Sequence, residues 1–431
     1  MRHVEKADGS GLTSSVRAGA IGGSAGRTGD YLAATSAASD SQGASDLHAP
    51  TAATQHDVRA YLTVHPVLSL GRPSILTPAV IRALGVLALG GAFAAGAAAA
   101  THPRRGDIRL VAQRSGTAAL LQDVSAVDSD VVWVGGHSAA WAVSTDGGEH
   151  WRSAAMPNAD SLEFRDVHAV DARTAYLLSS GLGERSRIYK TTDGGASWAL
   201  EFTARNPRAF YDCFAFWDGT HGVAMSDAVD GHFLVITTSD GVRWSPVPPH
   251  ALPAALPNEG AFAASGTCAM ALPPGDAWIG TGNARTARIL RTGDRGATWD
   301  VANTPLAADT SAGITSLAVR DARHIVALGG HIARLHAFQH DVAITDDGGR
   351  TWTMGGALPF PGPVFGAAYS RSTEPWLVAV GPGGAAASTD DGRTWTLIDS
   401  AAYWSVGFGS ARIGWAVGPN GRITRIELPT R

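Results

Sequence analysis

Thr191-Thr-Asp-Gly-Gly-Ala-Ser-Trp198 is the most informative stretch of this 431-residue chain, because related versions of it recur along the sequence. The shared pattern is S/T-x-D-x-G-x-x-W, which occurs five times in full and once in a shortened form. The other copies are Ser144-Thr-Asp-Gly-Gly-Glu-His-Trp151, Thr292-Gly-Asp-Arg-Gly-Ala-Thr-Trp299, Thr345-Asp-Asp-Gly-Gly-Arg-Thr-Trp352, Ser388-Thr-Asp-Asp-Gly-Arg-Thr-Trp395 and the shortened Ser239-Asp-Gly-Val-Arg-Trp244. Successive tryptophans lie 47, 46, 55, 53 and 43 residues apart, which indicates a repeat architecture.

Each repeat also contains short segments in which apolar and polar residues alternate. In the second repeat they are Phe164-Arg-Asp-Val-His-Ala-Val170, Thr174-Ala-Tyr-Leu-Leu-Ser179 and Arg187-Ile-Tyr-Lys-Thr-Thr192. Alternation bounded by Gly, Asp and Pro predicts short antiparallel strands, with the motif as the turn and its tryptophan at the start of a fourth strand. Four strands in roughly 47 residues correspond to one blade of a β-propeller.

The motif has the composition of a structural turn. Aspartate accepts hydrogen bonds from backbone N–H groups two residues on, the Ser/Thr hydroxyl offers a second local partner, and glycine supplies backbone angles that other residues resist. The tryptophan buries a large ring between neighbouring blades. We therefore assign structural roles to Asp146 and Trp151, Asp193 and Trp198, Asp240 and Trp244, Asp294 and Trp299, Asp347 and Trp352, and Asp390 and Trp395.

The number of blades follows from the candidates for the innermost strand of each repeat. These begin near Gln122, Phe164, Tyr211, Ala261, Gly313, Val364 and Tyr403, which makes seven. The last unit has three strands and no motif, so the segment Asp107-Ile-Arg-Leu-Val-Ala112 is expected to supply its outer strand and close the ring. We predict an all-β fold, a seven-bladed β-propeller with four-stranded antiparallel blades over residues 107–431. Six blades with an irregular extra unit is the alternative.

Two regions precede this domain. Residues 1–71 are rich in Ala, Gly, Ser and Thr, and they are interpreted as a disordered leader or as a mis-annotated one with the true start near Val64 or Leu68. Residues 72–100 hold arginines followed by the uncharged run 83–100, which predicts a signal peptide cut after Ala100 or a membrane anchor. The run is mostly Ala and Gly, which favours the signal. The predicted location is periplasmic or secreted, and the alternative is a protein anchored in the membrane by this segment.

Composition excludes several classes of function. Lys plus Arg is 34 and Asp plus Glu is 38, so the formal net charge of −4 gives no electrostatic reason to expect nucleic acid or an anionic membrane as a partner. A membrane contact is expected only through the N-terminal segment, if it is not cleaved. Two cysteines build neither a disulfide framework nor a four-cysteine zinc site. No cofactor is expected.

The repeat is similar to the Asp-box, or bacterial neuraminidase repeat. Units such as Gly414-Trp-Ala-Val-Gly-Pro-Asn-Gly-Arg-Ile423 resemble the photosystem II stability/assembly factor family of propellers. The segments Tyr211-Asp-Cys-Phe-Ala-Phe-Trp-Asp218, Ser226-Asp-Ala-Val-Asp-Gly-His-Phe233 and 259–268 resemble a bacterial branch whose members are often labelled oxidoreductase. The resemblance implies a seven-bladed scaffold that binds protein in an extracytoplasmic compartment, and it implies nothing about photosynthesis.

Enzymatic functions are the competing hypotheses. Sialidases share the repeat, but their Arg-Ile-Pro signature does not occur here, where Arg187-Ile-Tyr189 is the nearest match. Other glycosidases need two carboxyls that face each other across a cleft, and propeller faces are able to supply them. A redox role finds no G-x-G-x-x-G or C-x-x-C motif. His331, His336 and His340 fall in one loop without the spacing of a metal site, so no metal is predicted.

Polar residues at the starts of the inner strands are the candidates for binding. They are Asp123, Arg165, Asp166, Tyr211, Asp212, Glu259 and Tyr403. Such positions crowd one mouth of the central channel, where convergent polar groups make a binding rim. The alternative is that these groups hydrogen-bond one another and channel water, with Arg165 and Asp166 as a screened ion pair.

Cys213 and Cys268 are placed in inner strands of consecutive blades. After export the two would be able to form a disulfide across the blade boundary. The other interpretation is a pair of buried thiols that pack as small apolar groups.

Together these observations predict an exported, non-enzymatic scaffold, monomeric, that binds a protein or peptide partner of the cell envelope. A glycan-active enzyme or a lectin is the rival class.

Overall fold

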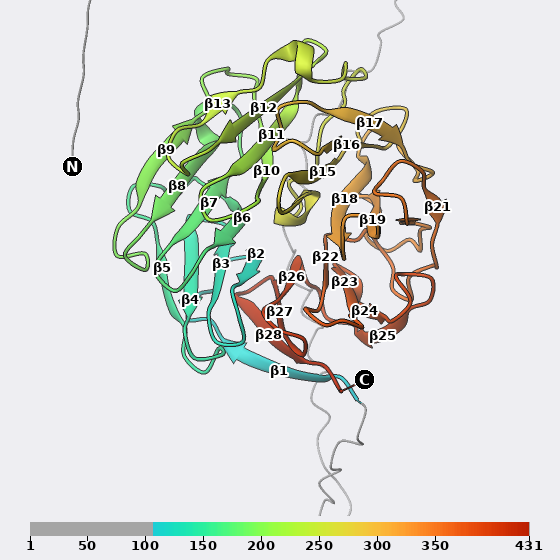
Figure 1. Ribbon diagram of the computed structural model, residues 1–431. Helices are drawn as coiled ribbons and strands as arrows, with labels where there is room; N and C mark the ends of the chain where they lie inside the picture. The colour runs from blue at the N-terminus through green and yellow to red at the C-terminus, as the bar shows by residue number, and fades with distance from the viewer. Residues whose placement is uncertain (1–106, 431) are drawn as a thin grey trace, which may run out of the picture. The chain divides into compact units, whose positions relative to one another are not determined.

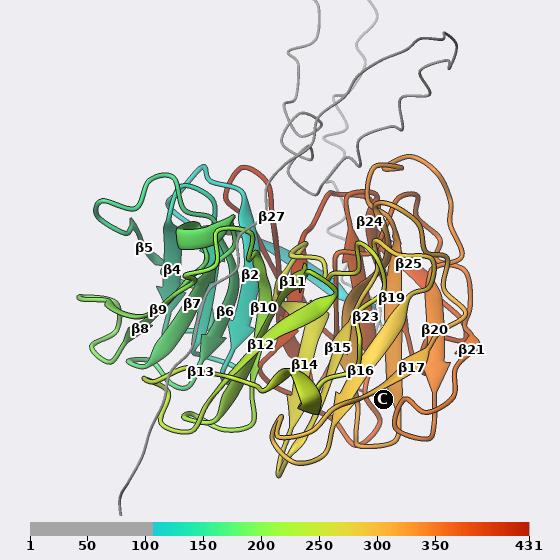
Figure 2. The ribbon, with the colours of Figure 1, turned by 90° about the horizontal axis from the view of Figure 1, so that it is seen from above.

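The computed structural model describes residues 107–430, which form seven four-stranded antiparallel sheets arranged in a ring (Figure 1). The prediction of an all-β, seven-bladed propeller is therefore confirmed, and the six-bladed alternative is wrong. Figure 2 shows the same ring from its side, with the strands running between its two faces. The predicted leader and the signal or anchor segment lie outside the described residues.

The blades follow one another along the chain, and each begins with its innermost strand. Blade 1 holds β2 (Leu121–Ala126), β3 (Val132–Gly136), β4 (Ala140–Ser144) and β5 (Arg152–Ala155); blade 2 holds β6 (Phe164–Ala169), β7 (Ala175–Ser179), β8 (Arg187–Thr191) and β9 (Ala199–Thr203); blade 3 holds β10 (Tyr211–Phe216), β11 (Gly222–Val229), β12 (His232–Thr238) and β13 (Ser245–Pro246). Blade 4 holds β14 (Ala269–Leu272), β15 (Asp276–Gly280), β16 (Arg288–Thr292) and β17 (Asp300–Asn303); blade 5 holds β18 (Ala312–Val319), β19 (Ile325–His331), β20 (Val342–Thr345) and β21 (Thr353–Met354). Blade 6 holds β22 (Gly366–Tyr369), β23 (Leu377–Gly381), β24 (Gly384–Ser388) and β25 (Thr396–Asp399), and short 3₁₀ turns occur at η2 (Gly183–Arg185), η3 (Pro249–Ala251) and η4 (Gly266–Cys268).

Blade 7 joins the two ends of the domain. It holds β26 (Ser405–Phe408), β27 (Ile413–Gly418) and β28 (Arg422–Glu427), and β1 (Arg109–Arg114) completes it from the N-terminal side (Figure 1). The register runs from Arg109 opposite Glu427 to Arg114 opposite Arg422. The prediction that an N-terminal strand closes the ring is thus confirmed, and Gln113 of β1 also accepts the indole N–H groups of Trp151 and Trp415.

Blade 4 departs from the sequence prediction. Its inner strand was expected near Ala261, but β14 begins at Ala269. Residues 260–268, called the plug here, are instead a loop that ends in η4 and lies inside the ring close to β10 and β18 (Figure 1). The physical reason is composition: the segment is made of Gly, Ala, Ser and Thr with one Phe and one Cys, without the period-2 alternation that a half-buried strand needs.

The core consists of seven apolar clusters, one between each pair of adjacent blades. Between blades 1 and 2, the Trp198 ring lies 6.0 Å from that of Trp133 and 5.6 Å from that of Trp141, edge to face with both. The tryptophans of the other motif copies likewise belong to the cluster between their own blade and the preceding one; they are Trp151, Trp244, Trp299, Trp352 and Trp395. Each ring therefore fills a wedge between two sheets.

The motif aspartate organises its turn with its own side chain. In the second copy, Thr191 Oγ1 donates to Asp193 Oδ1 at 2.8 Å and accepts the Gly195 N–H at 2.8 Å, while the Ser197 N–H donates to Asp193 Oδ1 at 2.9 Å. Gly195 has a φ of +84°, a conformation that L side chains resist. We call this arrangement the Asp turn.

The shortened copy keeps most of the Asp turn with one residue fewer. Thr238, one position before the expected Ser239, takes the hydroxyl role and accepts the Gly241 N–H at 2.9 Å. Asp240 accepts N–H groups two and three residues on, from Val242 at 2.8 Å and Arg243 at 2.7 Å. The hydroxyl-to-aspartate spacing is therefore preserved, and the deletion falls between the aspartate and the tryptophan.

Replacing the aspartate of one Asp turn should measurably destabilise the propeller. Asp347 accepts the N–H groups of Arg350 and Thr351, each at 2.9 Å, and the hydroxyl of Thr351 at 2.6 Å. We expect Asp347→Ala to lower the free energy of unfolding by about 1–2 kcal/mol, measured by urea denaturation. The neighbouring exposed Asp346 is the matched control, because only its backbone carbonyl accepts a hydrogen bond, from Arg323. Equal losses for Asp347→Ala and Asp346→Ala would contradict this role.

Candidate functional site

The inner strands of all seven blades surround a cavity of about 370 Å³. It extends from Gly266 of the plug to the far ends of the inner strands, such as Ala126 of β2 and Phe408 of β26. Side chains at the far end, including Ala169 and Tyr369, are partly exposed. The central channel is therefore closed by the plug at one face of the ring, and solvent reaches it from the opposite face.

The plug is tied to several blades at once. The side-chain amide of Gln122 donates to the carbonyl of Ala263 at 3.1 Å, and the Arg165 guanidinium donates to the same carbonyl at 3.2 Å. On the other side of the channel, Ser265 Oγ donates to the carbonyl of Phe365 at 2.6 Å. Side chains from blades 1 and 2 and a carbonyl next to blade 6 thus hold the plug across the end of the channel.

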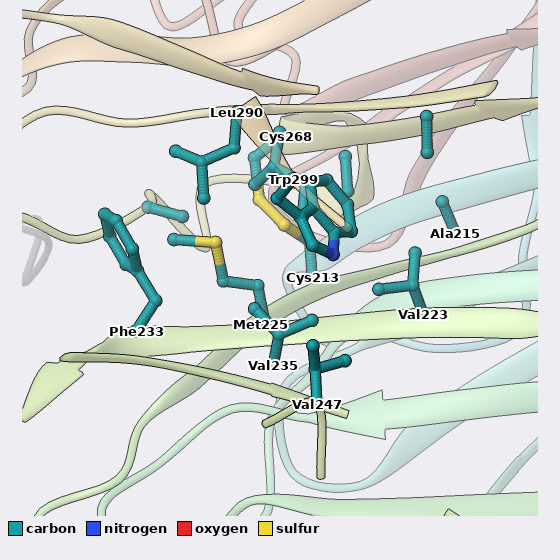
Figure 3. Close-up of a cluster of buried hydrophobic side chains, with 14 of the residues drawn as sticks. Cys213, Ala215, Val223, Met225, Phe233, Val235, Val247, Cys268, Leu290 and Trp299 are labelled. Carbon is teal, nitrogen blue, oxygen red and sulfur yellow. A yellow bond between two sulfur atoms is a disulfide. The ribbon is translucent and has the colours of Figure 1, made fainter. Parts of the chain in front are cut away.

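A disulfide fixes the last residue of the plug. Cys213 of β10 and Cys268 of η4 are bonded, with their Cα atoms 6.1 Å apart, and both are fully buried. They lie in the cluster between blades 3 and 4, beside Met225 and Trp299 (Figure 3). The sequence left open whether the two cysteines form a disulfide or remain buried thiols, and in the structure they form the disulfide. Cys268, however, belongs to the 3₁₀ turn before β14 and not to an inner strand.

Asp123 of β2 and Asp166 of β6 meet at the plug. A Cβ added to Gly266 would collide with oxygens of both carboxyls, so the plug passes this point only with a glycine. Ser405 Oγ donates to Asp123 Oδ1 at 2.6 Å, and the Val167 N–H donates to Asp123 Oδ2 at 3.0 Å. The two carboxyls and the glycine together make the floor of the cavity.

The floor carboxyls have raised pKa values. Burial raises the pKa of Asp123 to about 6. The pKa of Asp166 lies well above its usual range, because of burial first and the neighbouring Asp123 carboxylate second, although the Phe214 N–H donates to Asp166 Oδ2 at 2.7 Å and opposes the shift. Since like charges this close do not both ionise, the pair keeps one proton near neutral pH and carries one negative charge.

Asp212 of β10 and Asp227 of β11 form a second pair of buried carboxyls. A Cβ on Gly260, the first residue of the plug, would collide with Asp227 Oδ1. Burial raises the pKa of Asp212 well above its usual range, the Asp227 carboxylate adds to the rise, and the Arg165 guanidinium opposes it. Burial also raises the pKa of Asp227, to about 7. This pair therefore differs from the floor pair in having a guanidinium nearby.

The remaining nominated residues lie elsewhere in the fold. Arg165 pairs with Glu163, at 2.6 Å, and not with the adjacent Asp166, so the suggested Arg165–Asp166 ion pair is wrong. Glu259 is buried in an ion pair with Arg288 of β16.

The two tyrosines are also buried. Tyr211 packs its ring 5.1 Å from that of Phe202 in the cluster between blades 2 and 3. Tyr403 precedes β26, and its hydroxyl donates to Asp399 at 2.7 Å. Both rings therefore support packing between blades and do not line the cavity.

Seven residues were predicted to form the binding rim. The structure brings only Asp123 and Asp166 of these together at the cavity. Six of the seven are nine-tenths buried, Arg165 being the exception, so they do not form an open rim. Sequence reasoning missed Asp227 and Arg288, which complete buried pairs, and His168, which lines the cavity. The one signal available for His168 was its place in the alternating segment 164–170.

The histidines of the blade 5 loop do not form a metal site among the described residues. In residues 107–430, the group whose ligand atoms converge is Asp146, Glu149 and His150, all exposed. There His150 Nδ1 lies 2.7 Å from Asp146 Oδ2, within an Asp turn. The group is thus accounted for by turn structure.

The buried carboxyls predict that stability falls as pH rises from acid to neutral. A raised pKa means that the folded chain binds the proton more tightly than the unfolded chain. The contribution is therefore complete near the unfolded pKa of 3.8 and is lost as pH rises through about 6 for Asp123 and about 7 for Asp227. We expect urea denaturation to give a free energy of unfolding several kcal/mol lower at about pH 7.5 than at about pH 4.5.

Two variants test the assignment of this pH dependence. Asp227→Asn should reduce it, since an amide does not titrate and Asp123 still does, whereas Asp346→Asn on the surface should leave it unchanged. Below about pH 4 the Asp turns act in the opposite sense, because hydrogen bonds from Ser197 lower the pKa of Asp193 to about 2. A profile that rises from pH 4.5 to 7.5, or one that Asp227→Asn does not alter, would contradict the assignment.

No protein-family model and no curated protein matches the chain. Many solved structures match its fold, and two of them are propellers named YCF48. One, described as YCF48 bound to D1 peptide, is 18% identical, covers 75% of this chain and 97% of its own, and has a TM-score of 0.50. The other, YCF48 from Cyanidioschyzon merolae, is 15% identical, covers 74% of this chain and 98% of its own, and has a TM-score of 0.51. Both fit the resemblance drawn from the repeats, and at this identity they show the fold alone.

Among the described residues, no helix is long and apolar enough to cross a membrane.

Proposed function

We propose that this protein is an exported, monomeric scaffold without chemistry of its own, which binds a peptide segment of another protein at the open end of its channel. The cavity is the observation that carries the proposal. Its walls combine polar groups with small side chains such as Ala271 and Ala368, and such a hollow suits a slender ligand. The fold likeness to YCF48 supports it further, since one of those propellers is described as bound to a D1 peptide.

The rival class, a glycan-active enzyme, fits the described carboxyls less well. Glycoside hydrolysis needs two carboxyls about 5–10 Å apart on either side of a cleft that admits a sugar. Asp123 and Asp166 instead meet at Gly266 and share a proton, and Asp212 and Asp227 lie beneath the plug. A carboxyl pair that flanks Gly266 leaves no room for a ring between its members.

Export is supported by two features of the chain. A buried disulfide is typical of proteins that fold in an oxidising compartment. The basic and then apolar segment 72–100 is the pattern that a secretory signal requires. N-terminal sequencing of the protein recovered from the cell envelope tests this directly. A mature chain that begins directly after Ala100 is expected, and recovery of the uncut chain from the cytoplasm would contradict export.

Peptide binding is tested by selection of a displayed random-peptide library on the full chain. Selected peptides should lose at least about tenfold in affinity for Ala271→Leu, because a larger side chain in the wall of the cavity takes the space the ligand needs. Leu397→Ala, on the exposed face of the outer strand β25, is the control and should bind normally. Failure to select any peptide, or equal binding by both variants, would overturn the proposal.

A further inference from the structure

The floor of the channel carries a negative charge without a positive partner. The groups that contact Asp123 and Asp166 are a serine hydroxyl, backbone N–H groups and the plug glycine, and all of them are neutral. Among the described residues, neither carboxyl forms an ion pair. An uncompensated charge on buried carboxyls at the end of the cavity is costly to the free protein, so a cationic group in the cavity would relieve that cost.

The walls favour an apolar stem. Alanines contribute repeatedly to the lining, among them Ala169, Ala271 and Ala368, which also pack against the apolar clusters between the blades. Methyl groups of this kind pack against methylene groups, and the two floor carboxyls supply fewer ligands than the six or so oxygens that a bare divalent cation needs. The walls therefore point to an organic cation and not to a metal ion.

His168 and Arg371 are the side chains of the wall that are able to carry a positive charge. The imidazole of His168 stacks on Phe216, with ring centroids 4.5 Å apart, and burial lowers its pKa to about 4, so it is neutral and does not compensate the floor. Arg371 lies at the open end, where its guanidinium donates to the carbonyls of Ala126 and Val127 at 2.7 and 2.6 Å. The negative charge of the channel is thus confined to its floor.

The depth of the cavity fits a short alkyl chain. Asp123 at the floor and Ala126 at the open end are three residues apart on β2, a span of about 10 Å in an extended strand. A lysine side chain, with its flexible four-carbon stem and three ammonium donors, has the length and the donors that this space offers. A planar guanidinium would need a wider floor than two carboxyls that already enclose Gly266.

We propose that the channel is a binding site for a primary ammonium on a slender alkyl chain, with the ammonium received by Asp123 and Asp166 and the stem packed against the alanine-lined wall. This proposal rests on the proposed peptide-binding function, for which it names the recognised group. In a protein partner, a lysine side chain or the free N-terminal amine of an extended segment would supply that ammonium.

The test compares matched pairs of small ligands on the full chain by isothermal titration calorimetry. n-Butylammonium is compared with butan-1-ol, and Nα-acetyl-lysine methylamide with its Nε-acetylated form. A third pair, a short alanine peptide with a free or an acetylated N-terminus, distinguishes the two sources of the ammonium. In at least the first pair and one of the other two, the charged member is expected to bind at least about tenfold more tightly than the neutral one. Equal binding within all pairs, or no binding of any charged member, would overturn the proposal.

Two variants locate the site. Asp123→Asn should weaken binding of n-butylammonium at least about tenfold, because it removes the charge while keeping the shape. Ala271→Leu should weaken it by filling the wall. If Asp123→Asn does not fold, the comparison of ligand pairs on the unaltered chain still decides the question. Unchanged binding in both folded variants would place the ammonium outside the channel and overturn the assignment.

The same measurements separate this proposal from the proposed function. Selected peptides that bind without any lysine and with a blocked N-terminus would refute the ammonium site while peptide binding stands. Binding of n-butylammonium in the channel without any selectable peptide would refute peptide binding while the ammonium site stands.

Discussion

Replacing Arg288 with alanine is expected to lower the free energy of unfolding by about 3–5 kcal/mol, because it leaves the buried Glu259 carboxylate without its counter-charge. The side chains of Arg288 and Glu259 are only 9% and 0% exposed. Arg288 Nε donates to Glu259 Oε1 at 2.8 Å, and its terminal nitrogen donates to both Oε2 and, at 3.0 Å, the carbonyl of Ala254. Urea denaturation measures the loss.

Two controls identify the cause of that loss. Arg208 forms an ion pair with Asp230 in which both side chains are more than 60% exposed, so Arg208→Ala should leave the free energy of unfolding nearly unchanged. The double replacement of Glu259 by leucine and Arg288 by methionine should cost less than Arg288→Ala alone, since it leaves no unpaired charge. If Arg288→Ala lowered the free energy of unfolding no more than Arg208→Ala, Arg288 would not stabilise the buried Glu259 carboxylate as we expect.

The second large loss of stability is expected when the disulfide is removed. The bond between Cys213 and Cys268 closes a loop of 55 residues, and removal of a bond of that span should cost about 4 kcal/mol by its effect on the unfolded chain. We expect the doubly substituted chain, Cys213→Ala with Cys268→Ala, to unfold at a clearly lower urea concentration than the oxidised protein.

Reduction provides the matched comparison, because it breaks the bond without changing the packing atoms. The reduced wild-type chain should lose most of the same stability, and the double variant should be insensitive to reductant. A double variant as stable as the oxidised chain, or a wild type unaffected by full reduction, would contradict this prediction.

The sequence predicts the architecture because its information is local and repeated. Asp193 and Trp198 each act within or next to their own blade, so the pattern that marks a turn also fixes the blade period. The same holds for β1, whose place follows from the missing strand of the last unit. Even the shortened copy keeps its hydroxyl, since Thr238 stands two positions before Asp240 as in the full copies.

The candidate site was only partly predictable, because its contacts join distant parts of the chain. Asp123 and Asp166 were nominated from their place at strand starts, but their convergence depends on Gly266, 100 or more residues away in sequence. Glu259 and Asp212 were nominated as rim residues, whereas each is matched with a group, Arg288 or Asp227, that no spacing rule connects to it. The plug was missed since a loop inside a ring has no periodic signature.

Closure of the ring also limits when the domain is able to finish folding during its synthesis. β1 is synthesised before every other strand of the domain, whereas its partner β28 is synthesised after all of them. Pairing over so long a stretch of chain is intrinsically slow, because the ends must find each other through diffusion. A nascent chain that has produced six blades is thus still an open arc, and loss of only its final ten or so residues would leave β1 with nothing to pair with.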